Sequence, residues 1–217
     1  MYAAPPGYQT IIGATSLIVG PALMSIGDLF HPAETYAVAT QVAIVAQSAS
    51  RWYAAHLLLF VGMLLLVPGL LALTKVARDR RPAAGYAARL LMLASVGAFS
   101  AVFVFEMLLG RFISNGADPA AAVLLLETFQ SEIFVALVPG LLAFFVGTAL
   151  AVMSLASEAG PFRLPALGFA LGAILILGEI VLAEVLLSQI GNIVILVAGI
   201  AFAWLLLRGR EAAPVTG

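Results

Sequence analysis

Charged residues are scarce in this chain and cysteine is absent. Only 10% of the 217 residues are charged, whereas soluble domains carry about 25%. Without cysteine, disulfides, thiolate metal sites and cysteine nucleophiles are excluded. The sequence also lacks a P-loop, a dinucleotide fingerprint and a Gly-x-Ser-x-Gly turn. No basic face beyond ordinary topology signals is present, so nucleic-acid binding is excluded.

Hydrophobic residues make up 63% of the chain, and the mean hydropathy is +1.13. About 20 apolar residues are needed for a helix to cross a bilayer. Apolar runs predict six such helices, near residues 9–30, 53–74, 86–111, 131–155, 164–187 and 190–208. We therefore expect an all-α, polytopic membrane bundle of about six transmembrane helices that forms one domain over residues 1–217. The first run should remain as a membrane helix, because no basic n-region of a cleaved signal peptide precedes it.

Two connections carry helical signals of their own. Residues 119–130 are helix-like and either extend the fourth span or lie at the interface. Residues 32–50 are expected to form a long outer loop that is partly helical. Val67-Pro68-Gly69 recurs 71 residues later as Val138-Pro139-Gly140, through either chance or a duplicated helical hairpin. Each internal proline removes a helix hydrogen bond and is expected to kink its helix, which would open a cavity.

Basic residues predict the orientation of the bundle. Eight of the ten fall on one side: Lys75, Arg78, Arg80, Arg81, Arg89, Arg163, Arg208 and Arg210. The positive-inside rule makes that side cytoplasmic. We expect an integral, multi-pass protein of a bacterial-type inner or plasma membrane, with both termini in the cytoplasm and the lipid bilayer as its immediate partner.

Acidic residues gather on the opposite, outer side. Eight of the eleven carboxylates lie there, together with both histidines, Arg51 and Arg111. A carboxylate in hydrocarbon costs about 2.5–3.5 kcal/mol on insertion scales, so such groups are rarely retained without a partner or a role. The depth of each acidic residue in its predicted span separates the candidate cavity residues from Glu34, Asp118 and Glu127, which are expected to be solvated. Glu184 is assigned to neither group. The function of the chain is expected to lie in this acidic cavity.

The candidate catalytic residues follow from depth and chemistry. They are Glu179, Glu106, Glu132, Asp28 and His56. Asp28 and His31, three residues apart, share a helix face, and His31-Pro32 ends that helix. Aromatic and polar neighbours are the candidate substrate-binding residues: Trp52, Tyr53, Phe103, Phe105, Phe134, Arg51, Arg111 and Asn192. Trp52 and Tyr53 also suit an interfacial aromatic belt.

Clustered carboxyls in an aromatic-lined cavity suit proton transfer, since burial keeps one acid protonated while another stays ionised. Aromatic rings can also stabilise a carbocation. In its size, its density of spans and its intramembrane Glu106, Glu132 and Glu179, the chain resembles the integral-membrane terpene cyclases of meroterpenoid and indole-terpenoid biosynthesis. This resemblance implies a metal-independent isomerase or lyase without a cofactor, which protonates and cyclises a lipophilic isoprenoid epoxide or alkene. It carries no family catalytic position onto this sequence.

Three alternatives remain open. Intramembrane glutamates and broken helices also occur in proton- or cation-coupled transporters, although here the acids gather toward one face. A di-metal carboxylate site would typically show Glu-x-x-His pairs, and none is present, so no metal is expected. The third alternative is a non-catalytic accessory subunit whose charges satisfy a partner. The oligomeric state and the identity of the substrate do not follow from the sequence.

Overall fold

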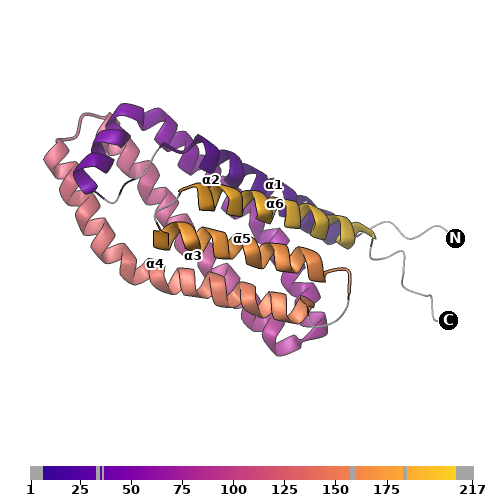
Figure 1. The fold of residues 1–217 in the computed structure, drawn as a ribbon. Helices are drawn as coiled ribbons and strands as arrows, with labels where there is room; N and C mark the ends of the chain where they lie inside the picture. The colour runs from indigo at the N-terminus through magenta and orange to yellow at the C-terminus, as the bar shows by residue number, and fades with distance from the viewer. Residues whose placement is uncertain (1–6, 33–34, 36, 157–159, 183–184, 209–217) are drawn as a thin grey trace, which may run out of the picture.

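The computed structural model describes residues 7–32, 35, 37–156, 160–182 and 185–208. These ranges contain six helices and no strand: α1 (Tyr8–Phe30), α2 (Val38–Arg80), α3 (Pro82–Ser114), α4 (Pro119–Ala156), α5 (Arg163–Leu182) and α6 (Val185–Arg208) (Figure 1). Within the described residues, α1, α2, α3, Leu137–Ala156 of α4 and Leu186–Arg208 of α6 are long and apolar enough to cross a membrane. The predicted all-α polytopic bundle is confirmed, and α5 occupies the position of the fifth expected span.

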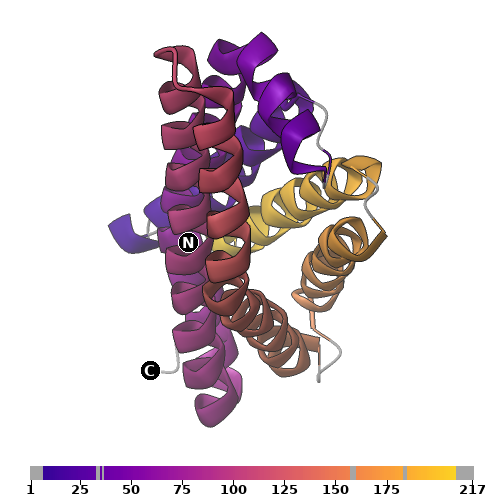
Figure 2. The ribbon, with the colours of Figure 1, turned by 90° about the vertical axis from the view of Figure 1, so that its left-hand side faces the viewer.

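The six helices pack as a closed ring. Each helix contacts the next in the chain, α6 returns to pack on α1, and α2 also contacts α4. Figure 2 shows the arrangement from one end, with α3 and α4 side by side on one flank and α5 and α6 on another. Four helices contribute large, fully buried side chains to the main core: Leu17, Leu73, Leu155 and Phe202.

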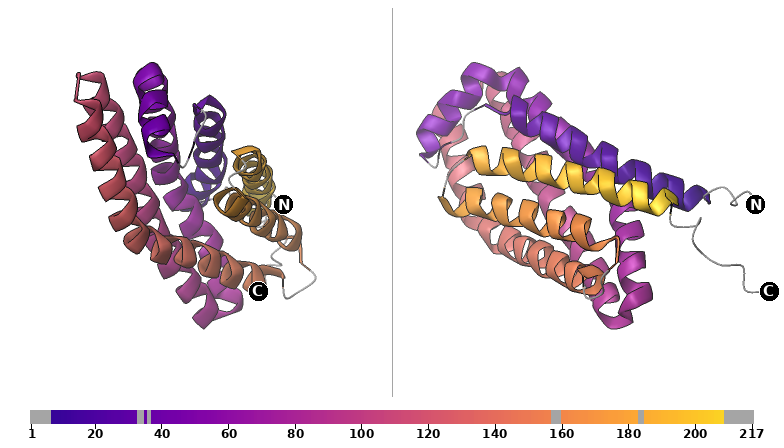
Figure 3. Two further views of the ribbon diagram at one scale, coloured as in Figure 1. Left: turned by 60° about the vertical axis from the view of Figure 1, so that its left-hand side comes forward. Right: turned by 45° about the vertical axis from the view of Figure 1, so that its right-hand side comes forward.

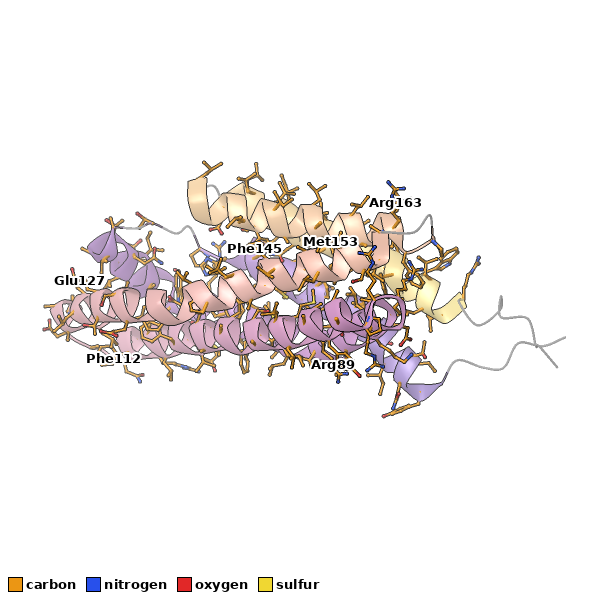
Figure 4. The ribbon with its side chains drawn as sticks, turned by 90° about the horizontal axis from the view of Figure 1, so that it is seen from below. Arg89, Phe112, Glu127, Phe145, Met153 and Arg163 are labelled. Atoms are coloured by element: carbon orange, nitrogen blue, oxygen red, sulfur yellow. The ribbon has the colours of Figure 1, made fainter. Side chains whose placement is uncertain are left out.

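The two ends of the bundle differ in charge. Arg89 and Arg163 lie at one end, and Glu127 lies at the other beside Phe112 (Figure 4). We call these the basic end and the acidic end. The segregation that the sequence predicts is therefore present in the fold, with α1 beginning and α6 ending toward the basic end (Figure 1).

Prolines and one glycine set several helix ends. Pro82 occupies the first turn of α3, where a missing N–H costs nothing. Gly116 has φ 83° in the turn between α3 and α4, a conformation that favours glycine. Pro32 follows the last residues of α1, and the backbone at His31 is extended, as expected for a residue that precedes proline.

Helices α2 and α4 are longer than the spans predicted for them. Helix α2 begins at Val38, so much of the expected outer loop is helical, and its one non-helical residue is Ser48 (φ −133°, ψ 27°). The Ser48 hydroxyl donates to the Ile44 carbonyl at 2.6 Å. Segment 119–130 is continuous with α4, and Figure 3 shows α4 turning away from α3 partway along its length.

The internal prolines do not break their helices. Pro68 lies within α2 at a point where the backbone stays helical, and Pro139 lies within α4. The interruption in α2 is at Ser48 instead, twenty residues earlier, toward the acidic end. The non-helical residue of α2 therefore lies toward the acidic end, near the functional site described below, and not at Pro68.

Glycines allow α1 and α2 to approach closely. A Cβ at Gly20 would lie 2.9 Å from the Gly62 carbonyl, and one at Gly27 would lie 2.9 Å from the Ala55 carbonyl. Such distances are shorter than real Cβ contacts, so these positions require glycine while the helices keep this separation. Gly27 lies four residues before His31 and Ala55 lies directly before His56, so this close approach occurs next to the two histidines.

Candidate functional site

A group of polar and aromatic side chains from α1, α2 and α6, with His31 just beyond α1, meets near the acidic end. We call it the imidazole cluster; its members are Asp28, His31, Trp52, His56, Ser188 and Asn192. His56 is 4% exposed and Trp52 is 2% exposed. The cluster therefore gathers the buried His56 and the half-buried Asp28 and His31 within an apolar bundle.

The two histidines face each other across α1 and α2. Their Nε2 atoms are 3.3 Å apart, and their ring centroids are 4.7 Å apart in an edge-to-face arrangement. Each Nδ1 lies close to a backbone carbonyl: that of His31 is 2.8 Å from the Pro32 oxygen, and that of His56 is 2.9 Å from the Trp52 oxygen. Both rings are thus oriented by hydrogen bonds on their far sides.

Trp52 packs against both imidazoles and connects them to α3. Its ring centroid is 4.6 Å from that of His31 and 4.7 Å from that of His56. The indole Nε1–H donates to the Glu106 backbone carbonyl at 3.1 Å. The sequence also suits Trp52 as an interfacial anchor, but in the fold its ring is buried inside the bundle.

Helix α6 holds the Asp28 carboxylate. Asn192 Nδ2 donates to Asp28 Oδ2 at 3.1 Å, and Ser188 Oγ donates to the same oxygen at 3.2 Å. Ser188 and Asn192 are four residues apart and share one face of α6. Gln189 adds a contact of 3.5 Å from its Nε2 to the Asp28 backbone oxygen. Asp28 is therefore an acceptor fixed by two side-chain donors.

Arg51 closes the end of α1. Its Nε donates to the Phe30 carbonyl at 2.6 Å, and its terminal nitrogen donates to the His31 carbonyl at 3.2 Å. These are carbonyls at the end of a helix, which a cation stabilises. Arg51 thus holds the chain reversal that carries His31.

His31 lies beyond the end of the first membrane helix, and its charge is set by competing neighbours. Burial lowers the pKa of His31, the positive charge of Arg51 adds to this effect, and the Pro32 carbonyl and the Asp28 carboxylate oppose it. Desolvation is the largest of these causes. Considered alone, the His31 ring is therefore neutral at pH 7.

The fold brings together part of the predicted site. Asp28, His56, Trp52, Asn192 and Arg51 converge, and the Phe103 ring lies 6.3 Å from His56. His31, named in the sequence as a neighbour of Asp28, becomes a central member. Ser188 had not been predicted; the signal for it was its position one helical turn before Asn192.

The other predicted residues lie elsewhere. Glu106 on α3 and Glu179 on α5 are half-buried, and both take part in further interactions. Glu132 is exposed on α4. Phe105 stacks on Phe129 of α4, within a small apolar cluster. The side chain of Phe134 lies outside the described part of the structure, as do residues Glu34 and Glu184.

Tyr53 and Arg111 line a separate cleft of about 220 Å³ between α2 and α3. Its remaining lining residues are Ala49, Ser50, Gly110 and Ser114. The Arg111 guanidinium lies 4.5 Å from the centroid of the Tyr53 ring. A Cβ at Gly110 would be 3.1 Å from Cδ1 of Trp52, so the indole lies directly behind this wall. Trp52 therefore packs against both imidazoles and also lies next to the Gly110 wall of the cleft.

Neither a metal-binding arrangement nor a related protein assigns a function to these residues. Among the described residues, no group of three or more histidine or acidic side chains is arranged to hold a metal ion. Comparison of the chain with protein-family models, with curated proteins and with solved structures finds no match.

Proposed function

We propose that this chain is a membrane-embedded enzyme that performs acid/base chemistry on a lipophilic substrate. The reaction proposed is the protonation-initiated cyclisation of an isoprenoid epoxide or alkene. The observation that carries the proposal is the convergence of the buried His56 with the half-buried His31 and Asp28 near the acidic end of a bundle of apolar helices. Groups that exchange protons are costly in such surroundings, and their retention supports a role in proton transfer.

Asp28 and His56 are assigned to proton transfer. An imidazole can release and accept a proton near neutral pH. Asp28, held by Ser188 and Asn192, is a positioned acceptor that would receive the proton lost when a cyclised cation is quenched. The half-buried Glu106 and Glu179 remain the candidates for the acid that first protonates the substrate.

Aromatic side chains provide the environment that a cationic intermediate needs. Trp52 and Phe103 flank His56 from two sides, and their π-faces attract a positive charge without acting as nucleophiles. The cleft lined by Tyr53 and Arg111 gives a route by which a polar end group of the substrate would be oriented, with Trp52 next to both the cleft and the acid/base groups.

The orientation in the membrane is part of the proposal. The basic end is assigned to the cytoplasm by the positive-inside rule, which places both termini there and the imidazole cluster toward the outer face. The substrate would then reach the site from the outer half of the bilayer.

The test is turnover of an isoprenoid epoxide by purified protein in phosphatidylcholine vesicles. We expect Asp28→Asn and His56→Gln to abolish cyclised product, and Glu106→Gln and Glu179→Gln to do the same if they supply the acid. Glu127→Gln, an exposed carboxylate on the same half of the molecule, is the control and should retain wild-type turnover. Full activity in Asp28→Asn and His56→Gln would refute the assignment.

A protonophore distinguishes an enzyme from a transporter in the same vesicles. Cyclisation needs no gradient, so product formation should be unaffected when the proton gradient is collapsed. Substrate uptake that stops under these conditions, without a chemical change in the substrate, would contradict the enzyme and favour proton-coupled transport.

A further inference from the structure

The two histidines of the imidazole cluster make more close contacts than two neutral rings can satisfy. A neutral imidazole has one N–H and one bare nitrogen, whereas an imidazolium has two N–H groups. Among the described residues, three close polar contacts connect these rings: Nδ1 of His31 to the Pro32 oxygen, Nδ1 of His56 to the Trp52 oxygen, and the 3.3 Å approach of the two Nε2 atoms. Each contact needs one hydrogen.

The carbonyl contacts decide which nitrogen carries the hydrogen. A carbonyl oxygen only accepts, so both Nδ1 atoms must donate. In two neutral rings this would leave both Nε2 atoms bare, with no hydrogen in the 3.3 Å contact between them. If one ring changed its tautomer, its Nδ1 lone pair would instead face a carbonyl oxygen at 2.8 or 2.9 Å. Either arrangement of two hydrogens leaves one close contact without a hydrogen.

One additional proton satisfies all three contacts. It converts one ring to an imidazolium whose Nε2–H donates to the bare Nε2 of the other ring. Two imidazole nitrogens alone do not complete the four-ligand set of a tetrahedral zinc site, and among the described residues no group of three or more histidine or acidic side chains is arranged to hold a metal ion.

The charged surroundings are compatible with one extra positive charge. Among the described residues, Asp28 on α1 supplies a carboxylate whose negative charge favours the protonated form of His31. Arg51 on α2 opposes it, with its guanidinium directed to the Phe30 and His31 carbonyls. Glu106 is the acidic residue on α3, the helix that receives the Trp52 hydrogen bond. Helix α6 contributes the neutral Ser188 and Asn192.

We propose that His31 and His56 bind one proton jointly, as an imidazolium–imidazole pair with an Nε2–H···Nε2 hydrogen bond and with Asp28 as counter-charge. The proton comes from the outer aqueous phase and adds to the bare Nε2 of one ring. No other bond forms or breaks. The pair is a proton-binding site whether or not the chain cyclises an isoprenoid, so its test is independent of turnover.

The experiment is nitrogen NMR of protein labelled with ¹⁵N-histidine in phosphatidylcholine vesicles, recorded across a pH titration. Since the chain has only two histidines, a protein purified without a histidine tag shows only the four nitrogens of this pair. We expect three N–H groups over four nitrogens in the protonated form, with both Nδ1 atoms protonated. One proton should be taken up per pair, and both rings should respond in the same step.

Two variants test the partners of the shared proton. His56→Gln leaves one imidazole in the chain, so the spectrum then reports His31 alone, and its ring should stay singly protonated over the pH range in which the wild-type pair takes up its proton. Asp28→Asn should move uptake of the shared proton to lower pH, whereas Asp79→Asn, which removes the same charge from an exposed pair with Lys75, should leave it unchanged.

The wild-type spectrum alone can overturn the proposal. Two N–H groups at every pH down to 5 would show a neutral pair, and independent titration of the two rings would show that no proton is shared. An unshifted uptake in a folded Asp28→Asn protein would remove Asp28 as the counter-charge. If that variant does not fold, the hydrogen count of the wild-type pair still decides between a shared proton and its absence.

Discussion

Replacing Gly27 with alanine tests whether the close approach of α1 and α2 builds the site. A Cβ at this position would lie 2.9 Å from the Ala55 carbonyl, 3.0 Å from Leu59 Cγ and 3.1 Å from Leu58 Cβ. Ordinary contact begins at 3.4 Å, so α1 must move from α2 by about 0.5 Å to accept the methyl group. The nearest atom is backbone, which cannot rotate away.

The energetic effect has two opposing parts. Overpacking of a close contact costs about 1–3 kcal/mol, and alanine gains about 1 kcal/mol over glycine in a helix interior. Gly97→Ala on α3 is the matched control, because nothing lies within 4 Å of its Cβ and only the gain applies. The difference between the two variants should therefore be about 1–3 kcal/mol, with Gly27→Ala the less stable.

The same displacement should disrupt the imidazole pair. The Nε2 atoms of His31 and His56 are 3.3 Å apart, close to the upper limit for a hydrogen bond, and a shift of about 0.5 Å would carry them beyond it. Unfolding in detergent and the ¹⁵N-histidine spectrum measure the two effects. Gly27→Ala with the stability of Gly97→Ala and with unchanged histidine signals would refute this account of helix packing.

Two further predictions concern the neighbours of the pair. Trp52→Phe removes the indole hydrogen bond to the Glu106 carbonyl, and the loss of this bond should cost about 0.5–1.5 kcal/mol in detergent unfolding; a stability equal to that of wild type would show that water or another donor replaces the indole. The second prediction concerns pH in the His56→Gln protein, where His31 has no imidazole partner. Because burial lowers the pKa of His31 from 6.5, the unfolded chain binds a proton more readily than the folded one, so stability should be full above pH 6.5 and fall as the pH drops below it. Stability that rises on acidification of this variant would contradict the direction of the shift.

Much of the candidate site followed from local sequence, and the rest depended on distant contacts. The i, i+3 spacing of Asp28 and His31 predicted that they share a face, and the one-turn spacing of Trp52 and His56 placed the latter deeper in its helix. Ser188 lies one helical turn before Asn192, but its partner Asp28 is 160 residues away, so local spacing could not predict their contact. Glu132 was predicted to be a cavity residue from its depth along the chain, yet its side chain is exposed, since depth does not determine which side of a helix faces the bundle.

The sequence by itself determined that the chain is an all-α membrane bundle with charge segregated at its two ends. These properties depend on the length and composition of apolar runs and on the positions of arginine and lysine, which act through the bilayer rather than through specific neighbours. Only the tertiary structure decided that His31 and His56 face each other at 3.3 Å. That contact depends on glycine packing between α1 and α2 and on the course of the chain after Phe30, and it arises from the approach of two backbones that no local pattern encodes.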